Sequence, residues 1–122
     1  MPRTSVVMFR EDDGSVPVLE WFGELPSKVQ DKCRLRIERL SELGHELRRP
    51  EADYLRDGVY QLRVRQHSVN YRVLYFFHGD KAIVLSHGLQ KERVVPPKEI
   101  DLAVKRKSKY SANPKKYSAE EQ

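Results

Sequence analysis

The chain has very little cysteine and no long run of apolar residues. Cys33 stands alone, so no disulfide can form within the chain and no thiol pair is available for a zinc knuckle or a redox couple. No segment approaches the ~18 apolar residues of a membrane-spanning helix. The first residues, MPRTSVVMFREDDG, carry acids where a signal peptide needs an apolar core. We therefore expect a cytoplasmic protein with no membrane partner.

What is present suffices for one small basic domain. The 122 residues are 39% hydrophobic and 34% charged, and domains usually run ~100–150 residues. The net charge of +5 is unevenly spread, because residues 1–53 hold 9 Lys/Arg against 11 Asp/Glu while residues 54–122 hold 14 against 7. The second half is therefore the candidate surface for a polyanion.

The first half predicts a strand, two helices and a loop. Residues 4–9 are short, β-branched and apolar, which is typical of a strand. Residues 18–25 favour a short helix. Residues 27–43 favour a longer one, because apolar residues recur at the spacing of one helix face: Val29, Cys33, Ile37, Leu40 and Leu43. Residues 45–54 are polar and include a proline, so they predict a connecting loop.

The ends of the longer helix carry their own signals. Ser27 with Gln30 three residues later predicts a capping box. Gly44 is well placed to end the helix, since glycine is favoured just beyond the last turn.

The second half predicts three strands and a helix. Residues 59–66 alternate between an apolar face and a polar face that carries Gln61, Arg63 and Arg65. Strands at 71–78 and 81–88 follow, each after a short turn, and a helix begins near Lys98 after two prolines.

The order of these elements predicts an α+β domain. A small twisted antiparallel sheet, made of a three-strand meander and the N-terminal strand, would pack against two N-terminal helices and a C-terminal helix, all on one sheet face. The expected single domain spans residues 1–107. Residues 108–122 are polar, and we expect them to form a flexible tail.

Several segments in order resemble the RelE/ParE toxin superfamily, and most closely its HigB-like and phage-derived host-inhibition branch. They are LPSKVQ (25–30), G-x-Y-x-L-R-x-R (58–65), YRVLYFF (71–77), HG-x-x-K (87–91) and P-x-x-E-I-x-x-A (97–104). The resemblance covers most of residues 16–107, and the order and spacing of the segments make it more specific than any one of them.

The resemblance implies a toxin of a type II toxin-antitoxin system. Many members cleave messenger RNA on the ribosome as mRNA interferases, inhibit translation and are held inactive by an antitoxin encoded beside them. It implies three partners for this chain: a helix-turn-helix, HigA-like antitoxin, the ribosome and mRNA. Two alternatives stay open, a ParE-like protein that blocks DNA gyrase without cleaving anything, and a degenerate member that binds nucleic acid or an antitoxin without toxicity.

RNA cleavage does not require a nucleophile from the protein, because the 2′-hydroxyl of RNA is itself the nucleophile. The protein must orient the attack, stabilise the charge growing on the phosphorane and move protons. No cofactor and no metal are expected. Cations fixed where the charge develops suit the second task, and the resemblance assigns catalytic roles to four basic residues: Arg63, Arg65, Arg72 and Lys91.

The general base is left open. Gln61 stands where related toxins often have a lysine proposed as a base, and Pro97 lies near a position where they have a tyrosine that stacks on a nucleobase. His87, His67 and Lys91 are substitutes for the base, and Tyr110 is a substitute for the tyrosine.

Further residues are candidates for RNA contact, and some of them also have a purely structural explanation. Gln61, His67, Arg93, Lys105, Lys109 and Tyr110 form the predicted RNA-binding set. The basic residues at 105–109 either contact RNA phosphates or simply form the solvent-exposed face of the helix. Arg72 is also explained as a buried arginine paired with Asp57 or Glu99.

Overall fold

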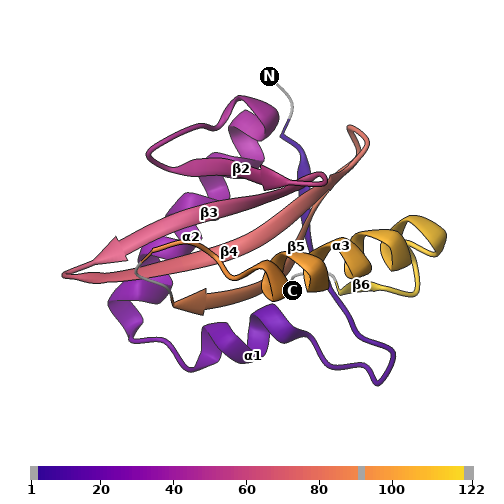
Figure 1. Ribbon diagram of the computed structural model, residues 1–122, viewed down its shortest axis with the longest axis horizontal. Helices are drawn as coiled ribbons and strands as arrows, with labels where there is room; N and C mark the ends of the chain where they lie inside the picture. The colour runs from indigo at the N-terminus through magenta and orange to yellow at the C-terminus, as the bar shows by residue number, and fades with distance from the viewer. Residues whose placement is uncertain (1–2, 91–92, 120–122) are drawn as a thin grey trace.

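The structure is a computed structural model, and it describes residues 3–90 and 93–119. Its centre is a six-stranded sheet in the order β2-β3-β4-β5-β1-β6 (Figure 1). The strands are β1 (Ser5–Phe9), β2 (Ala52–Arg56), β3 (Val59–Gln66), β4 (Val69–His78), β5 (Ala82–Gln90) and β6 (Ser118–Ala119). Strands β2 to β5 form an antiparallel meander, and β1 pairs with β5 in parallel. The predicted α+β class is confirmed.

Helices cover both faces of this sheet. Helices α1 (Pro17–Gly23) and α2 (Ser27–Leu43) lie on one face, and α3 (Pro97–Ala112) crosses the other (Figure 1). We call these the α2 face and the α3 face. The expectation that all helices share one face is wrong, because β4 is apolar on both sides and each side needs a cover. None of the described helices has the length and apolar character needed to cross a membrane.

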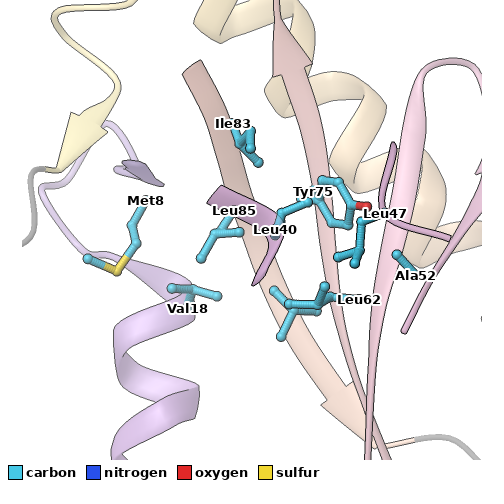
Figure 2. Close-up of a cluster of buried hydrophobic side chains, with 10 residues drawn as sticks. Met8, Val18, Leu40, Leu47, Ala52, Leu62, Tyr75, Ile83 and Leu85 are labelled. Atoms are coloured by element: carbon cyan, nitrogen blue, oxygen red, sulfur yellow. The ribbon is translucent and has the colours of Figure 1, made fainter. Parts of the chain in front are cut away.

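Two apolar layers hold the sheet in place. On the α2 face, side chains of the central strands meet those of the two N-terminal helices, with Leu62, Tyr75 and Leu85 packed against Val18 and Leu40 (Figure 2). On the α3 face, Val59 and Leu74 pack against Ile100 and Ala103. Burial of large apolar side chains on both faces is the main driving force for this arrangement.

Two local expectations for the first half are wrong. The end of the stretch expected to be a loop, residues 52–54, begins the edge strand β2, which joins β3 through a tight turn at Asp57 (φ 53°) and Gly58 (φ 81°). Positive φ at both positions is the signature of the type I′ turn that hairpins favour. The capping box is also absent from the described start of α2, since Gln30 Nε2 instead donates to the carbonyl of Phe22 at 2.9 Å. Gly44 ends α2 as predicted.

The C-terminal segment differs from the expected flexible tail. Helix α3 continues to Ala112, and β6 adds to the sheet beside β1. The ring of Tyr117 stacks on Phe9 at 5.4 Å between ring centroids, and Asp12 accepts hydrogen bonds from Lys109 and Tyr117. These aromatic and ionic contacts hold a segment whose polar composition alone suggests no fixed position.

Candidate functional site

Two arginines stand directly opposite each other on the α3 face. The two-residue turn at His67–Ser68 sets the β3–β4 register, and Arg63 pairs with Arg72 in it. Directly opposite residues share a sheet face with Cβ atoms ~4.5–5.5 Å apart, and like charges there are unfavourable. Such an arrangement is stabilised when an anion joins the two cations.

Arg72 is buried yet has no carboxylate beside it in the described chain. Its side chain is 6% exposed. Nη1 donates to Gln61 Oε1, and Nη2 donates to the carbonyl of Arg93 at 3.2 Å. Burial lowers the pKa of Arg72 from its ordinary value, and the positive charge of Arg63 lowers it further. A buried guanidinium held only by neutral oxygens keeps its charge available to an incoming anion.

The alternative explanation of Arg72 as half of an internal ion pair with Asp57 or Glu99 is therefore wrong. Asp57 pairs with Arg56 at 2.7 Å, and Glu99 pairs with His87 at 3.0 Å. Both partners lie on other elements of the fold. Neither carboxylate neutralises Arg72.

Gln61 links the pair to a carboxylate at the edge of the sheet. Asp53 on β2 stands opposite Gln61, and the Arg49 guanidinium binds Asp53 at 2.8 Å. Hydrogen bonding from Arg49, and secondarily from Gln61, lowers the pKa of Asp53. Because a carboxylate only accepts hydrogen bonds, the amide nitrogen of Gln61 faces Asp53 and its oxygen faces Arg72. Arg72 is thus positioned through a chain of polar contacts.

Arg65 extends the basic face toward the β3–β4 turn. It lies two residues after Arg63, so it shares the same sheet face, and it is exposed. Its Nε donates to the carbonyl of His67 at 3.1 Å. His67 itself is exposed at the turn with a positive φ of 57°.

His87 lies on the same face but belongs to a second polar cluster. Its Nδ1 lies 2.8 Å from Ser86 Oγ and 3.2 Å from Arg106 Nη1, while its Nε2 lies 3.0 Å from Glu99 Oε1. Arg106 has only donors, so Nδ1 accepts and the Nε2 proton is donated to Glu99. Burial lowers the pKa of His87, with a further lowering from Arg106 and an opposing effect from Glu99. Both ring nitrogens are engaged inside the protein.

A β-bulge turns His87 toward this cluster. Leu74 pairs with His87 but Tyr75 pairs with Leu85, so Ser86 is an extra residue on β5. Regular alternation would have placed His87 on the α2 face with Leu85. The bulge reverses it to the α3 face.

Arg106 is a buried member of this cluster, contrary to the prediction from the sequence. It was expected on the solvated side of the C-terminal helix, yet it is 7% exposed and its Nη2 binds Glu11 at 2.9 Å. Its spacing from Ile100, Ala103 and Tyr110 follows one helix face, and that periodicity was the available signal. A carboxylate on each side, Glu11 and Glu99, makes the cluster an internal network.

Leu74 separates the two clusters. It lies between Gln61 and His87 in one row across β3, β4 and β5. Its side chain is fully buried and packs with Val95 and Ile100. His87 is therefore screened from the Arg63–Arg72 pair by an apolar residue.

The remaining predicted residues are scattered. Arg93 is exposed next to the pair and contributes its backbone carbonyl to Arg72. Lys105 is exposed on α3, and Lys109 binds Asp12 at 2.9 Å. Tyr110 is 4% exposed and packs on Phe76, so its ring is not presented to RNA. Lys91 lies outside the described residues.

Two further features of the described chain concern metal ligands and cavities. No three residues among His, Cys, Asp and Glu are grouped as potential metal ligands within the part of the chain that the structure describes. A cavity of 840 Å³ lies on the α2 face among α1, α2 and β1, on the opposite side of the sheet from Arg63 and Arg72. The α3 face carries the opposed guanidinium groups of Arg63 and Arg72.

Comparison with known protein families shows what the chain is similar to. A family model described as "Phage derived protein Gp49-like (DUF891)" matches residues 20–108. These residues include α2, the whole meander and most of α3. No curated protein matches the chain significantly.

Proposed function

Because the chain belongs to the phage-derived Gp49-like family, we propose that it is a toxin that inhibits translation by cleaving messenger RNA on the ribosome. The family is consistent with a HigB-like toxin. The observation that carries the proposal is the placement of Arg63 opposite Arg72, with no carboxylate partner for Arg72 among the described residues. A scissile phosphodiester is the anion that this pair fits.

In this mechanism the two guanidinium groups act on the phosphate. As the 2′-oxygen attacks, negative charge grows on the non-bridging oxygens, and planar N–H donors already in place stabilise that charge more than the ground state. Gln61 and the Arg93 carbonyl hold Arg72 so that it does not have to reorganise. Arg65 would contact a neighbouring phosphate.

Proton transfer falls to groups other than His87. Both of its ring nitrogens are engaged internally, and Leu74 lies between it and the arginines. The groups left open for this task are His67 at the β3–β4 turn, Lys91, the RNA itself, bound water and the ribosome. Dependence on the ribosome would follow if the ribosome supplies one of these proton carriers.

An antitoxin is the expected partner of this chain. Toxin-antitoxin pairing is suggested by the family, and a helix-turn-helix, HigA-like protein with an acidic segment would neutralise the basic α3 face. Binding there would shield Arg63 and Arg65 from RNA.

The test is expression of the wild-type chain and of Arg72→Ala, with Lys81→Ala as a control that removes an exposed cation from the β4–β5 turn. The wild type and the control should arrest growth and cut transcripts within codons. Arg72→Ala should reduce cleavage by roughly 100- to 1,000-fold, as for loss of a group that stabilises a transition-state oxyanion. Full toxicity in Arg72→Ala would overturn the proposal, and growth arrest with intact transcripts would favour the gyrase-blocking alternative.

A further inference from the structure

The basic character of the α3 face continues around one edge of the sheet onto α2. Strand β2 pairs with β3 only from Val59 to Leu62, so in the described chain no strand covers β3 from Val64 onward. Helix α2 lies behind this free edge, and Lys32 Nζ donates to the carbonyl of Arg65 at 3.1 Å. The two sheet faces are thus joined by cations at this edge.

Six residues form this feature, which we call the cationic band. From the α3 face to α2 they are Arg72, Arg63, Arg65, Lys32, Lys28 and Arg36. The three α2 members are spaced at i and i+4, so they form one row along the helix, with neighbours ~5–6 Å apart. Alternate strand residues on β3 are separated by a similar ~6–7 Å.

Few negative charges interrupt the band. Within the described residues, the one carboxylate within 4.0 Å of a band cation is Glu51, which lies 3.8 Å from Arg36. Glu51 is already held by Arg39 through two hydrogen bonds of 2.8 and 2.7 Å. The band therefore carries several charges without an ion-pair partner among the described residues, whereas basic residues near it are paired, such as Arg49 with Asp53.

We infer that the cationic band binds the phosphates of an RNA strand beyond the scissile one, so that the strand passes from the Arg63–Arg72 pair over the free edge of β3 onto α2. A row of evenly spaced cations fits a backbone with a charge on every nucleotide, whereas a single small anion would occupy only one position. This inference rests on the proposed function for its starting point at Arg72. It assigns Lys28 and Lys32 a role in RNA binding that is separate from cleavage.

The test compares a double variant with a matched control. Lys28→Ala/Lys32→Ala removes two band lysines, and Lys81→Ala/Lys115→Ala removes two exposed lysines far from the band. Binding of a 2′-O-methylated, single-stranded oligonucleotide is measured over a range of salt concentrations. The band variant should bind more weakly, and its log–log salt slope should be shallower by about 0.7 for each lost phosphate contact. The control should match the wild type.

Two further arms locate the strand. A trinucleotide, which reaches only the Arg63–Arg72 pair, should bind the band variant and the wild type equally. Weaker binding of the long oligonucleotide by the band variant assigns the band to the substrate strand. Weaker binding to ribosomes with unchanged binding of the long oligonucleotide would assign the band to ribosomal RNA and overturn the inference. Unchanged affinity and salt slope for both the oligonucleotide and ribosomes would overturn it as well.

Failure of this inference is distinguishable from failure of the proposed function. Arg72→Ala reports on cleavage, and the band variant reports on the affinity and salt dependence of binding. If Arg72→Ala stops cleavage while the band variant binds RNA normally, the band is refuted and the nuclease stands. If Arg72→Ala cleaves normally while the band variant binds weakly, the nuclease site is refuted and the band stands.

Discussion

Gln61 presents its side-chain oxygen to Arg72 while its amide nitrogen faces Asp53. An amide is suited to this position because it accepts on one side and donates on the other. It holds the guanidinium without neutralising it, which a carboxylate would do. The identity of residue 61 therefore controls how much of the Arg72 charge is available to a phosphate.

Replacing Gln61 with glutamate should separate activity from folding. Gln61→Glu nearly preserves the shape of the side chain but places a negative charge beside Arg72, so cleavage should fall by roughly 10- to 100-fold. Gln61→Leu should instead destabilise the fold by about 1–3 kcal/mol, because Arg72 loses a buried hydrogen-bond partner. Cleavage assays and urea unfolding of both variants would check this. Wild-type activity in a folded Gln61→Glu protein would contradict the positioning role.

Asp53 should affect cleavage by orienting the Gln61 amide. Asp53→Asn keeps an oxygen that can accept from Gln61, while Asp53→Ala removes it and lets the amide turn over. We expect Asp53→Ala to lower kcat by up to about 100-fold with little change in KM, as for a misplaced catalytic group, and Asp53→Asn to retain most activity. Equal losses in the two variants would instead point to the ion pair with Arg49, which both variants lose.

The architecture was largely predictable, because it depends on periodicity. Alternation in 59–66 placed Arg63 and Arg65 on one face, and the helical spacing from Val29 to Leu43 predicted α2 with its observed bounds. The edge strand β2 was missed because an edge strand needs few apolar residues and its sequence is polar.

The site was predictable only in part, because it depends on register. The Arg63–Arg72 pairing follows from a two-residue turn at His67–Ser68, and one residue more would have shifted the pairing. His87 reaches the α3 face only through an extra residue at Ser86, which the sequence pattern does not predict. Arg106, which contacts His87, pairs with Glu11, and these two residues are 95 positions apart in the chain, a separation that local patterns do not bridge.

The His87 cluster should make stability dependent on pH near neutrality. Burial lowers the pKa of His87 below its ordinary value of 6.5, so the unfolded state takes up a proton more readily than the folded state. The stability from neutral His87 is fully present above pH 6.5 and decreases as the pH falls below it. Carboxylates such as Asp53 titrate in a lower range, since their ordinary pKa is 3.8.

Urea unfolding at about pH 7.5 and pH 5.5 would measure this effect, because the unperturbed histidine pKa lies between these values. The wild type should lose stability at the lower pH, and His87→Asn should lose less. The same pH dependence in His87→Asn would show that another group is responsible. Cleavage by the folded variant should stay close to wild type, since His87 is screened from the arginines by Leu74.

The glycine of the HG-x-x-K segment should prove structural, because Gly88 faces the ring of Trp21. A Cβ at Gly88 would lie 2.2 Å from Trp21 Cδ2, a distance that no packing arrangement tolerates. Gly88→Ala should therefore push α1 away from β5 and destabilise the fold by about 1–3 kcal/mol. Gly23→Ala is the matched control, since a Cβ there meets nothing within 4 Å. Trp21→Leu should relieve part of the Gly88→Ala defect when the two are combined, and a double variant that is less stable than the sum of the single changes would show that the close contact is not the cause.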